Sequence, residues 1–375
     1  MGELGGFIEH FSILPDPRVD RTKKHILIDI LFIGVCTVVC GGEGFTDMED
    51  FATAKEDWLR KYLELPGGIP SHDTFRRVFS IMDPGEFVAC FVAWSQALHE
   101  ATRGEVIALD GKTIRHSFDI ASGQPALHII SAWASENGLA LGHVKVDNKS
   151  NEITALPKLL KMLDIKGKTI TMDAMGCQKE LAGQIVDAGG DYVLCVKGNQ
   201  VSLHEDVAWF FDECEDFEGV DHTYYESVEK DHGRIEVRKC WAVEGEAKWL
   251  GFGEEWKGLR SIAALQAERI IRGVSSKEMR YYISSLPGDA QKIALAVREH
   301  WAIENSLHYV LDVTMNEDMS RVRKDNAPEN LATLRRIAIN MVRKDKTPMK
   351  GRSSIRRAMK RAAYLNASLE QILVS

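Results

Sequence analysis

Two short apolar segments, each ending in an aspartate, set the strongest limit on the fold of this 375-residue chain. Val106–Leu109 runs directly into Asp110, and Thr169–Met172 runs directly into Asp173. Short, partly β-branched runs of this kind predict buried strands. If the strands are parallel neighbours in register, their carboxylates lie side by side and suit Mg²⁺ or Mn²⁺ rather than zinc. Each aspartate alone fits equally well as the cap of a turn after its strand.

Residues 1–104 are expected to form a mostly helical N-terminal region, which the helix pair described below makes a candidate DNA-binding domain. An apolar helix is expected over Ile26–Cys40, and an amphipathic helix over Asp47–Leu63. Ser71 suits the N-cap of a third helix, and Asp83 precedes a fourth. The second and third helices resemble a helix-turn-helix, although such pairs are common in proteins that do not bind DNA.

From residue 105 the apolar spacing changes to that of strands, with helices between the later ones. Three consecutive strands are followed by a helix that crosses over to the second Asp strand, which is then parallel to an earlier strand. This order predicts a ribonuclease-H-like core, a mixed five-stranded sheet with helices, formed by residues 105–214 and 288–318. In that topology the first and fourth strands are neighbours. The expected strands are Val106–Thr113, Ala126–Ala134, Leu139–Val146, Thr169–Asp173 and Asp191–Val196.

Residues 215–287 predict a β-rich insertion in this core, with turns between four β-like segments. A helix is expected to follow from Ala290 to Val313, and helices rich in Arg and Lys occupy residues 319–375. The formal net charge of the whole chain is -8. The Arg- and Lys-rich segment 319–375 nevertheless suits local contact with phosphate, because its positive charge is concentrated in one part of the chain. A solvated helical face explains the same composition.

Glu304 is the candidate for a third carboxylate of the same site. Trp301, Ile303 and Leu307 surround it in the sequence, which predicts a position near a buried helix face. A carboxylate there needs a partner, and a metal ion is a suitable one. A surface glutamate at the edge of an amphipathic helix fits the spacing as well.

Composition argues against several other classes of protein. The most apolar run, Ile30–Cys40, is too short to cross a bilayer of about 30 Å. The N-terminus lacks the pattern of a signal peptide. The seven cysteines form no CxxC pair and no zinc-ligand spacing, so reduced thiols in a cytoplasmic protein are expected.

Several motifs, taken together and in order, resemble insertion-sequence DDE transposases that carry a β-strand insertion before the last acidic residue. The resemblance is closest to the H-repeat-associated group. It covers residues from about 110 to 330, and the N-terminal segment also resembles the accessory domain of that group. The matching stretches are Leu109–Lys112, Asp173–Gln178, Lys197–Gln200, Asp231–Glu236, Arg280–Ser285 and His300–Asn305.

The resemblance implies that Asp110, Asp173 and Glu304 form the DDE triad and hold two Mg²⁺ or Mn²⁺ ions. It implies a DNA transposase that cleaves at the ends of an insertion sequence and joins the 3′ ends to target DNA. The expected partner is double-stranded DNA, bound by a homodimer in the cytoplasm or nucleoid, with no membrane and no small-molecule substrate. Related proteins often carry Arg four residues before the Glu and Lys seven residues after it. Here those positions hold His300 and Leu311.

Polar residues near the triad are candidates for DNA contacts, although most fit equally well as turn or surface residues. Trp301 fits base stacking, but a tryptophan on an amphipathic helix is more often part of the core. The predicted DNA contacts are Lys112, Arg115, Lys197, Asn199, His232, Arg234, Arg298, His300, Asn305, Arg321 and Arg323, with Arg335 and Arg336 as further candidates for gripping the DNA backbone.

Two other functions fit the same residues. One is a DNA-binding relic of a transposase that has lost catalysis. The other is a metal-dependent nuclease of the same fold that cuts DNA without joining it. Incubation with end-containing DNA and Mg²⁺ separates the three hypotheses, because only a transposase both nicks and joins.

Overall fold

The computed structural model describes residues 5–100, 106–119, 123–147, 152–213, 220–231, 233–245, 255–345 and 354–374. The chain forms two compact units. Unit 1 consists of residues 1–103, 111–149 and 304–375, and unit 2 consists of residues 104–110 and 150–303.

Unit 1 is mainly helical, as the apolar spacing predicts. The helix α2 is apolar on nearly all sides and is almost entirely buried, and α11 packs against α2, α5 and α6. Ser71 caps α5, because its hydroxyl accepts the backbone N–H of Thr74 at 3.4 Å. The helices of this unit are α1 Gly5–Phe11, α2 Leu27–Val39, α3 Phe45–Ala54, α4 Glu56–Leu59, α5 His72–Ile81, α6 Pro84–Glu100, α11 Ala327–Lys344, α12 Ile355–Tyr364 and α13 Asn366–Val374.

One expected helix of this unit is divided in two. The segment predicted as a single helix over Asp47–Leu63 forms α3 and α4, with Lys55 between them. α4 is a single turn, so the residues after Leu59 are not helical. This change lengthens the connection to α5 beyond the short turn that joins the helices of a helix-turn-helix.

The strands β2 (Leu127–Ala134) and β3 (Leu139–Lys145) form an antiparallel hairpin in unit 1. Asn137-Gly138 predicts this hairpin, and Gly138 lies at a φ of 66°, which favours glycine. α6 and α11 both pack against β3. The strand β1 (Val106–Ile114) is shared, since its residues up to Asp110 belong to unit 2 and the rest to unit 1.

In unit 2, β1 pairs with β4 (Thr169–Met172) in parallel, and β4 pairs with β5 (Asp191–Val196) in parallel. The helix α7 (Glu152–Met162) precedes β4, and α8 (Lys179–Asp187) connects β4 to β5. The predicted crossover, with the second Asp strand parallel to the first, is therefore confirmed. After β5 the chain continues into α9 (Val201–Glu213).

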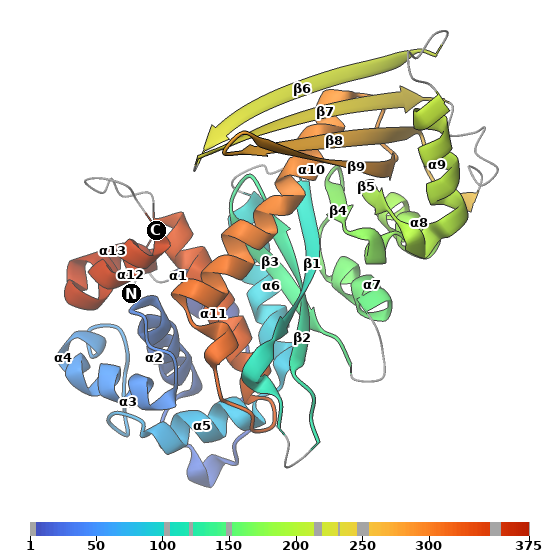
Figure 1. The fold of residues 1–375 in the computed structure, drawn as a ribbon. Helices are drawn as coiled ribbons and strands as arrows, with labels where there is room; N and C mark the ends of the chain where they lie inside the picture. The colour runs from blue at the N-terminus through green and yellow to red at the C-terminus, as the bar shows by residue number, and fades with distance from the viewer. Residues whose placement is uncertain are drawn as a thin grey trace. The chain divides into compact units, whose positions relative to one another are not determined.

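The predicted five-stranded sheet is wrong in its number of strands. The four insertion strands, β6 (His222–Asp231), β7 (Arg234–Glu244), β8 (Ser261–Ile271) and β9 (Val274–Ser284), lie side by side and antiparallel (Figure 1). β9 also pairs with β5, so the strand order becomes β3-β2-β1-β4-β5-β9-β8-β7-β6 in a nine-stranded sheet. The expectation failed because β5 offered a free edge, and the insertion extends the sheet there.

The helix α10 (Ala290–Ile303) covers the insertion strands and closes the core of unit 2. Ile293 and Val297 of α10 pack with Cys195, Ala263 and Tyr282 in one buried cluster. The helix predicted to continue to Val313 instead changes to two π-helical turns, Glu304–His308 and Val310–Thr314.

Among the described residues, no single helix is long and apolar enough to cross a membrane. The helices α5 and α6 meet that test of length and composition only as a pair, and they are bent by 91° relative to one another.

Candidate functional site

The structure places Asp110 and Asp173 at the same level of two neighbouring parallel strands. In the β1–β4 register Leu109 lies opposite Met172, so the next residue on each strand is an aspartate. Parallel strands present residues at the same level to one edge of the sheet. Backbone pairing within unit 2 therefore places Asp110 and Asp173 at the same level, while the prediction that their carboxylates share one metal site stays a prediction.

The Asp173 side chain also caps the turn after β4, so the alternative role for this aspartate is observed. Its Oδ1 accepts the backbone N–H groups of Met175 at 3.1 Å and Gly176 at 3.4 Å. Partial burial and the negative charge of Glu152 raise the pKa of Asp173, while these hydrogen bonds and Lys197 oppose the rise. A carboxylate in this environment is stabilised by an additional positive charge.

Lys197 and Asn199 lie beside the turn that holds Asp173. Both are exposed and directly follow β5, and the charge of Lys197 acts on the Asp173 carboxyl. The Asn199 side-chain amide donates to the Ala174 carbonyl at 2.5 Å. The end of β5 is thereby tied to the end of β4, and an exposed lysine acts on the Asp173 carboxyl.

His300 of α10 faces the strand that carries Asp173. Its Nδ1 lies 3.1 Å from the Thr171 hydroxyl, two residues before Asp173 on β4. Burial lowers the pKa of His300 to about 4. The charge of Arg280 adds to this lowering, and the contact with Thr171 opposes it. The imidazole is therefore neutral near pH 7 and acts through hydrogen bonding rather than charge.

Glu304 begins the first π-helical turn and is exposed, together with Asn305. The sequence leaves two positions open for Glu304, near a buried helix face or at the surface edge of an amphipathic helix, and the surface position is the one observed. A π turn adds a residue to the helical repeat and shifts the faces of the residues that follow. Glu304 belongs to unit 1, whereas Asp110 and Asp173 belong to unit 2.

The donor chemistry of these side chains suits a hard divalent cation. Asp110 and Asp173 present carboxylates at one level, and Glu152 adds a third negative charge near Asp173. Oxygen donors of this kind bind Mg²⁺ and Mn²⁺. Within the part of the chain that the structure describes, no three His, Cys, Asp or Glu side chains are gathered closely enough to hold a metal ion.

Lys112 lies inside β1, which continues to Ile114, and not in the turn beyond it. Its side chain is buried, and its Nζ lies 2.7 Å from Asp312, 3.3 Å from Glu317 and 3.1 Å from Asp318. Burial opposes the charge of Lys112, but the three carboxylates outweigh it and raise the pKa. The expected phosphate contact therefore does not agree with the position of this residue.

Arg335 and Arg336 are also buried, contrary to their predicted role on a DNA-binding face. The Nη1 atoms of Arg336 and Arg335 lie 3.3 Å and 3.9 Å from the fully buried Glu317 carboxylate. Arg336 also donates to the Ser131 hydroxyl. These two positive charges neutralise an internal glutamate, so they do not contribute positive charge to the protein surface.

The remaining basic candidates of unit 1 differ in exposure. Arg115 is exposed and lies 3.3 Å from Asp318 through its Nε, and Arg321 is exposed. Arg323 is half-buried, since its guanidinium lies over the Phe118 ring at 5.0 Å and donates to the His116 carbonyl. Arg115 and Arg321 remain available to a phosphate group.

The basic candidates in and beside the insertion form ion pairs. Arg298 of α10 pairs with Glu229 of β6 at 3.1 Å, and Arg234 pairs with Glu236 at 2.8 Å. Both arginines lie close to the surface, so these pairs are weak and can exchange for other anions. His232 lies outside the described residues.

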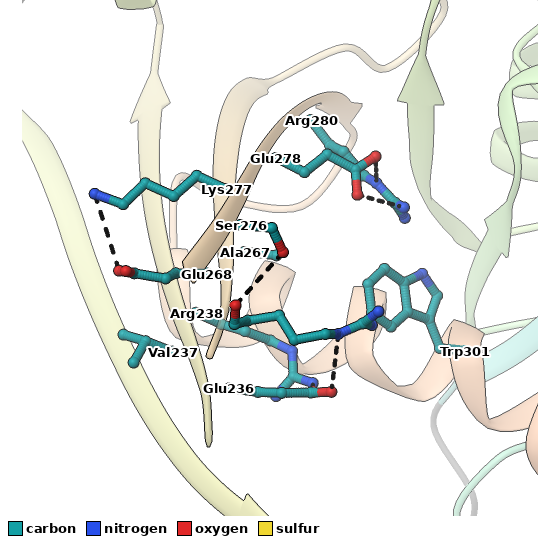
Figure 2. A pocket seen from close by; sticks show the side chains of 11 residues that line it. Glu236, Val237, Arg238, Ala267, Glu268, Ser276, Lys277, Glu278, Arg280 and Trp301 are labelled. Atoms are coloured by element: carbon teal, nitrogen blue, oxygen red, sulfur yellow. Dashed lines mark hydrogen bonds and ion pairs between the residues drawn. The ribbon is translucent and has the colours of Figure 1, made fainter. Parts of the chain in front are cut away.

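A cavity of about 340 Å³ lies between β7, β8, β9 and Trp301. Figure 2 shows the indole at one side of this cavity, facing charged side chains of the three strands. The guanidinium of Arg280 lies 4.7 Å from the Trp301 ring centroid and that of Arg238 lies 5.9 Å from it. Trp301 is therefore partly exposed in a polar cavity rather than fixed in the apolar core.

Sequence reasoning missed Glu152 and Thr171. Glu152 begins α7 and is more than forty residues from Asp110, so only the packed crossover brings its charge near Asp173. Thr171 alternates with Asp173 along β4, and strand periodicity does predict that both point to one face. The sequence does not indicate that His300 would meet that face.

The chain matches the family described as Transposase DDE domain over residues 101–341, and the family described as DDE_Tnp_1-associated over residues 8–95. It is 43% identical over 375 residues to the H repeat-associated putative transposase YhhI of Escherichia coli K12, covering 99% of this chain and 98% of that protein. It is 43% identical to the putative transposase YncI of Escherichia coli O157:H7, covering 99% and 95%.

Two further likenesses are more limited. A protein named inactive transposase YbfQ, from Escherichia coli K12, is 45% identical over 78 residues, which are 21% of this chain and 93% of that protein. A solved piggyBac transposase synaptic complex with hairpin DNA matches at 13% identity and a TM-score of 0.41, covering 98% of this chain and 76% of that one. A structural likeness this low supports no argument about the fold.

Proposed function

Because this chain belongs to the transposase DDE domain family, we propose that it is a DNA transposase of an insertion sequence. It cleaves at the ends of the element and joins the freed 3′ ends to target DNA. The observation that supports this most directly is the in-register pairing of β1 and β4, in which Leu109 lies opposite Met172, the residues directly before Asp110 and Asp173. The parallel strands β1, β4 and β5, followed by α9, fit a ribonuclease-H-like core extended by the insertion.

We assign Asp110, Asp173 and Glu304 as ligands of two Mg²⁺ or Mn²⁺ ions. When bound, the ions supply the charge that neutralises the attacking and leaving oxygens of an in-line displacement at phosphorus. In this proposal the pairing of β1 with β4 fixes the backbone positions of Asp110 and Asp173. The backbone N–H groups of Met175 and Gly176 fix one oxygen of Asp173. Neutral His300 positions β4 through Thr171 and leaves the charge of the site unchanged.

DNA lies, in this proposal, along the exposed basic residues near these carboxylates. Lys197 is the strongest candidate for a phosphate contact, because it is exposed and adjacent to Asp173. The cavity at Trp301 offers an aromatic ring and guanidinium groups that suit a nucleotide. Further proposed contacts are Arg115, Asn199, His232, Arg234, Arg298, Asn305, Arg321 and Arg323. A homodimer is expected, since two element ends must be held in one complex.

The test combines the protein with linear DNA that contains the element ends, Mg²⁺ and a supercoiled target. We expect nicking at the ends followed by joining, and Asp110→Asn should lower nicking by about 100-fold or more while DNA affinity changes little. The matched control is Asp187→Asn, which removes an exposed carboxylate paired with Lys257. Binding without cleavage favours the inactive relic, and cutting without joining favours the nuclease.

A further inference from the structure

Glu304 stands at the start of an unusual stretch of helix. Two π-helical turns follow one another, Glu304–His308 and Val310–Thr314, and the backbone N–H of Met315 donates to the Val310 carbonyl at 3.1 Å. π turns are rare, and they occur often at functional sites. Their wider hydrogen-bonding pattern is less stable than that of an α-helix, so this segment requires support from its surroundings.

Arg343 of α11 provides such support next to Glu304. Its Nη2 donates to the Ser306 carbonyl at 2.7 Å, two residues after Glu304. Its guanidinium lies 4.9 Å from the centroid of the Trp133 ring. Gly138 leaves room on another side, because a Cβ there would lie 2.9 Å from Nη1 of Arg343. A tryptophan ring, a glycine turn and a backbone carbonyl thus enclose the guanidinium.

The charge of Arg343 is not balanced by a carboxylate among the described residues. Burial lowers the pKa of Arg343 to about 10, so the side chain remains positive at neutral pH. A partly buried guanidinium without a counter-charge lowers stability unless hydrogen bonds replace its hydration. The hydrogen bond from Nη2 to Ser306 supplies part of this replacement, whereas Nε has no hydrogen-bond partner among the described residues, so the position of Arg343 depends on the π turn.

A second cation fastens the other end of the same segment. Lys112 lies 2.7 Å from Asp312 in the second π turn and contacts Glu317 and Asp318, which follow it. Lys112 is part of β1, two residues after Asp110. The segment from Glu304 to Asp318 is therefore held by the half-buried Arg343 near its start and by the buried Lys112 near its end.

We propose that Arg343, assisted by Lys112, is a positioning residue that fixes the π-helical segment and thereby the location of the Glu304 carboxylate. This inference rests on the proposed function, in which Glu304 is a metal ligand. Arg343 acts through the Ser306 backbone and does not touch the DNA or the reacting atoms. Its loss leaves Glu304 present but poorly placed.

The test compares Arg343→Met with Arg18→Met in the full-length chain. Arg18 is a suitable control because it is buried and also donates to a backbone carbonyl, that of His25, at 2.8 Å. Hydrogen–deuterium exchange over residues 304–314 should rise in Arg343→Met and stay unchanged in Arg18→Met. Mn²⁺ binding to the DNA complex, followed by electron paramagnetic resonance, should weaken roughly 10- to 100-fold only in Arg343→Met.

Arg343→Lys keeps the charge and an N–H donor group on a shorter side chain, so it should fold and show a smaller effect in the same direction. Unchanged exchange and unchanged Mn²⁺ binding in both Arg343 variants would overturn the inference. Glu304→Gln separates this result from the proposed function. If Glu304→Gln nicks DNA at the normal rate, the triad assignment is wrong. If it is inactive while the Arg343 variants match the wild type, only the positioning role is wrong.

Discussion

His300 has the most clearly perturbed protonation among the residues proposed to surround the carboxylates. Burial lowers its pKa from 6.5 to about 4 in the folded protein. Between these two values the unfolded chain binds a proton and the folded chain does not. Protonation therefore favours unfolding, and the free energy of unfolding should fall as the pH decreases from about 6.5 towards 4.

This leads to a prediction for His300→Gln, which keeps a hydrogen-bonding side chain but does not titrate. The wild type should lose up to about 1.4 kcal/mol of stability per pH unit in that window relative to the variant. Urea unfolding at pH 7.0, 6.0 and 5.0 measures the difference. A constant difference at all three pH values would show that His300 is already protonated or is exposed in the folded protein.

The basic residues show which information a sequence lacks at the residue scale. Lys112, Arg335 and Arg336 resemble surface cations by residue type and by spacing along the chain. The structure pairs them with Glu317 and its neighbours inside unit 1. A count of charges cannot distinguish a cation that faces solvent from one that neutralises a buried acid. By contrast, the sequence did predict that Asp110 and Asp173 lie at the same level of the sheet, because each aspartate directly follows a short apolar strand of similar length.

Among the elements, the turn after β4 has the closest link to function. Gly176 ends this turn, and a Cβ at this position would lie 2.7 Å from the Cβ of Met172. The N–H groups of the same turn hold Oδ1 of Asp173. A side chain at residue 176 must therefore displace either the turn or the strand end.

We predict that Gly176→Ala lowers the rate of end nicking at least about 10-fold, through displacement of Asp173. The matched control is Gly183→Ala in α8, where a new Cβ meets no atom within 4 Å. That change should keep the nicking rate and leave the melting temperature unchanged or slightly higher, because alanine favours a helix. Equal nicking rates in the two variants would contradict the proposed role of the turn.

Most helices and strands were predictable from apolar periodicity, because strands such as β2 and helices such as α2 are long and regular. The joining of β9 to β5 was not, since an insertion can pair with any free sheet edge and the sequence does not specify which. The end of α10 at Ile303 was also missed. The π turns depend on contacts with Arg343 and Lys112, residues distant in the sequence.

On the scale of the whole molecule, the basic C-terminal segment divides its charge between the interior and the surface. Arg335 and Arg336 neutralise Glu317, and Arg343 supports the π turn. Much of the remaining charge is displayed by α12, where Arg356, Arg357 and Lys360 are exposed. Under the proposed function, α12 rather than α11 is the helix through which this segment contacts a DNA backbone.

Replacement of these three residues of α12 by Gln should reduce the salt dependence of DNA binding. Each lost phosphate contact lowers the slope of log K against log salt by about 0.9, so a reduction of roughly 2 to 3 is expected. The control replaces Lys179, Lys257 and Arg260, which carry the same total charge but lie in ion pairs. Fluorescence anisotropy at several salt concentrations gives both slopes, and equal slopes would exclude α12 from the DNA interface.

The strand β6 is the last in its sheet, so it presents an outer row of backbone N–H and C=O groups that no further strand of the described chain covers. Such an edge readily recruits a strand from another protein molecule. Glu226, Glu229 and Lys230 are exposed along β6, and their charges make that recruitment unfavourable. The insertion can therefore lengthen the sheet without becoming a seed for aggregation.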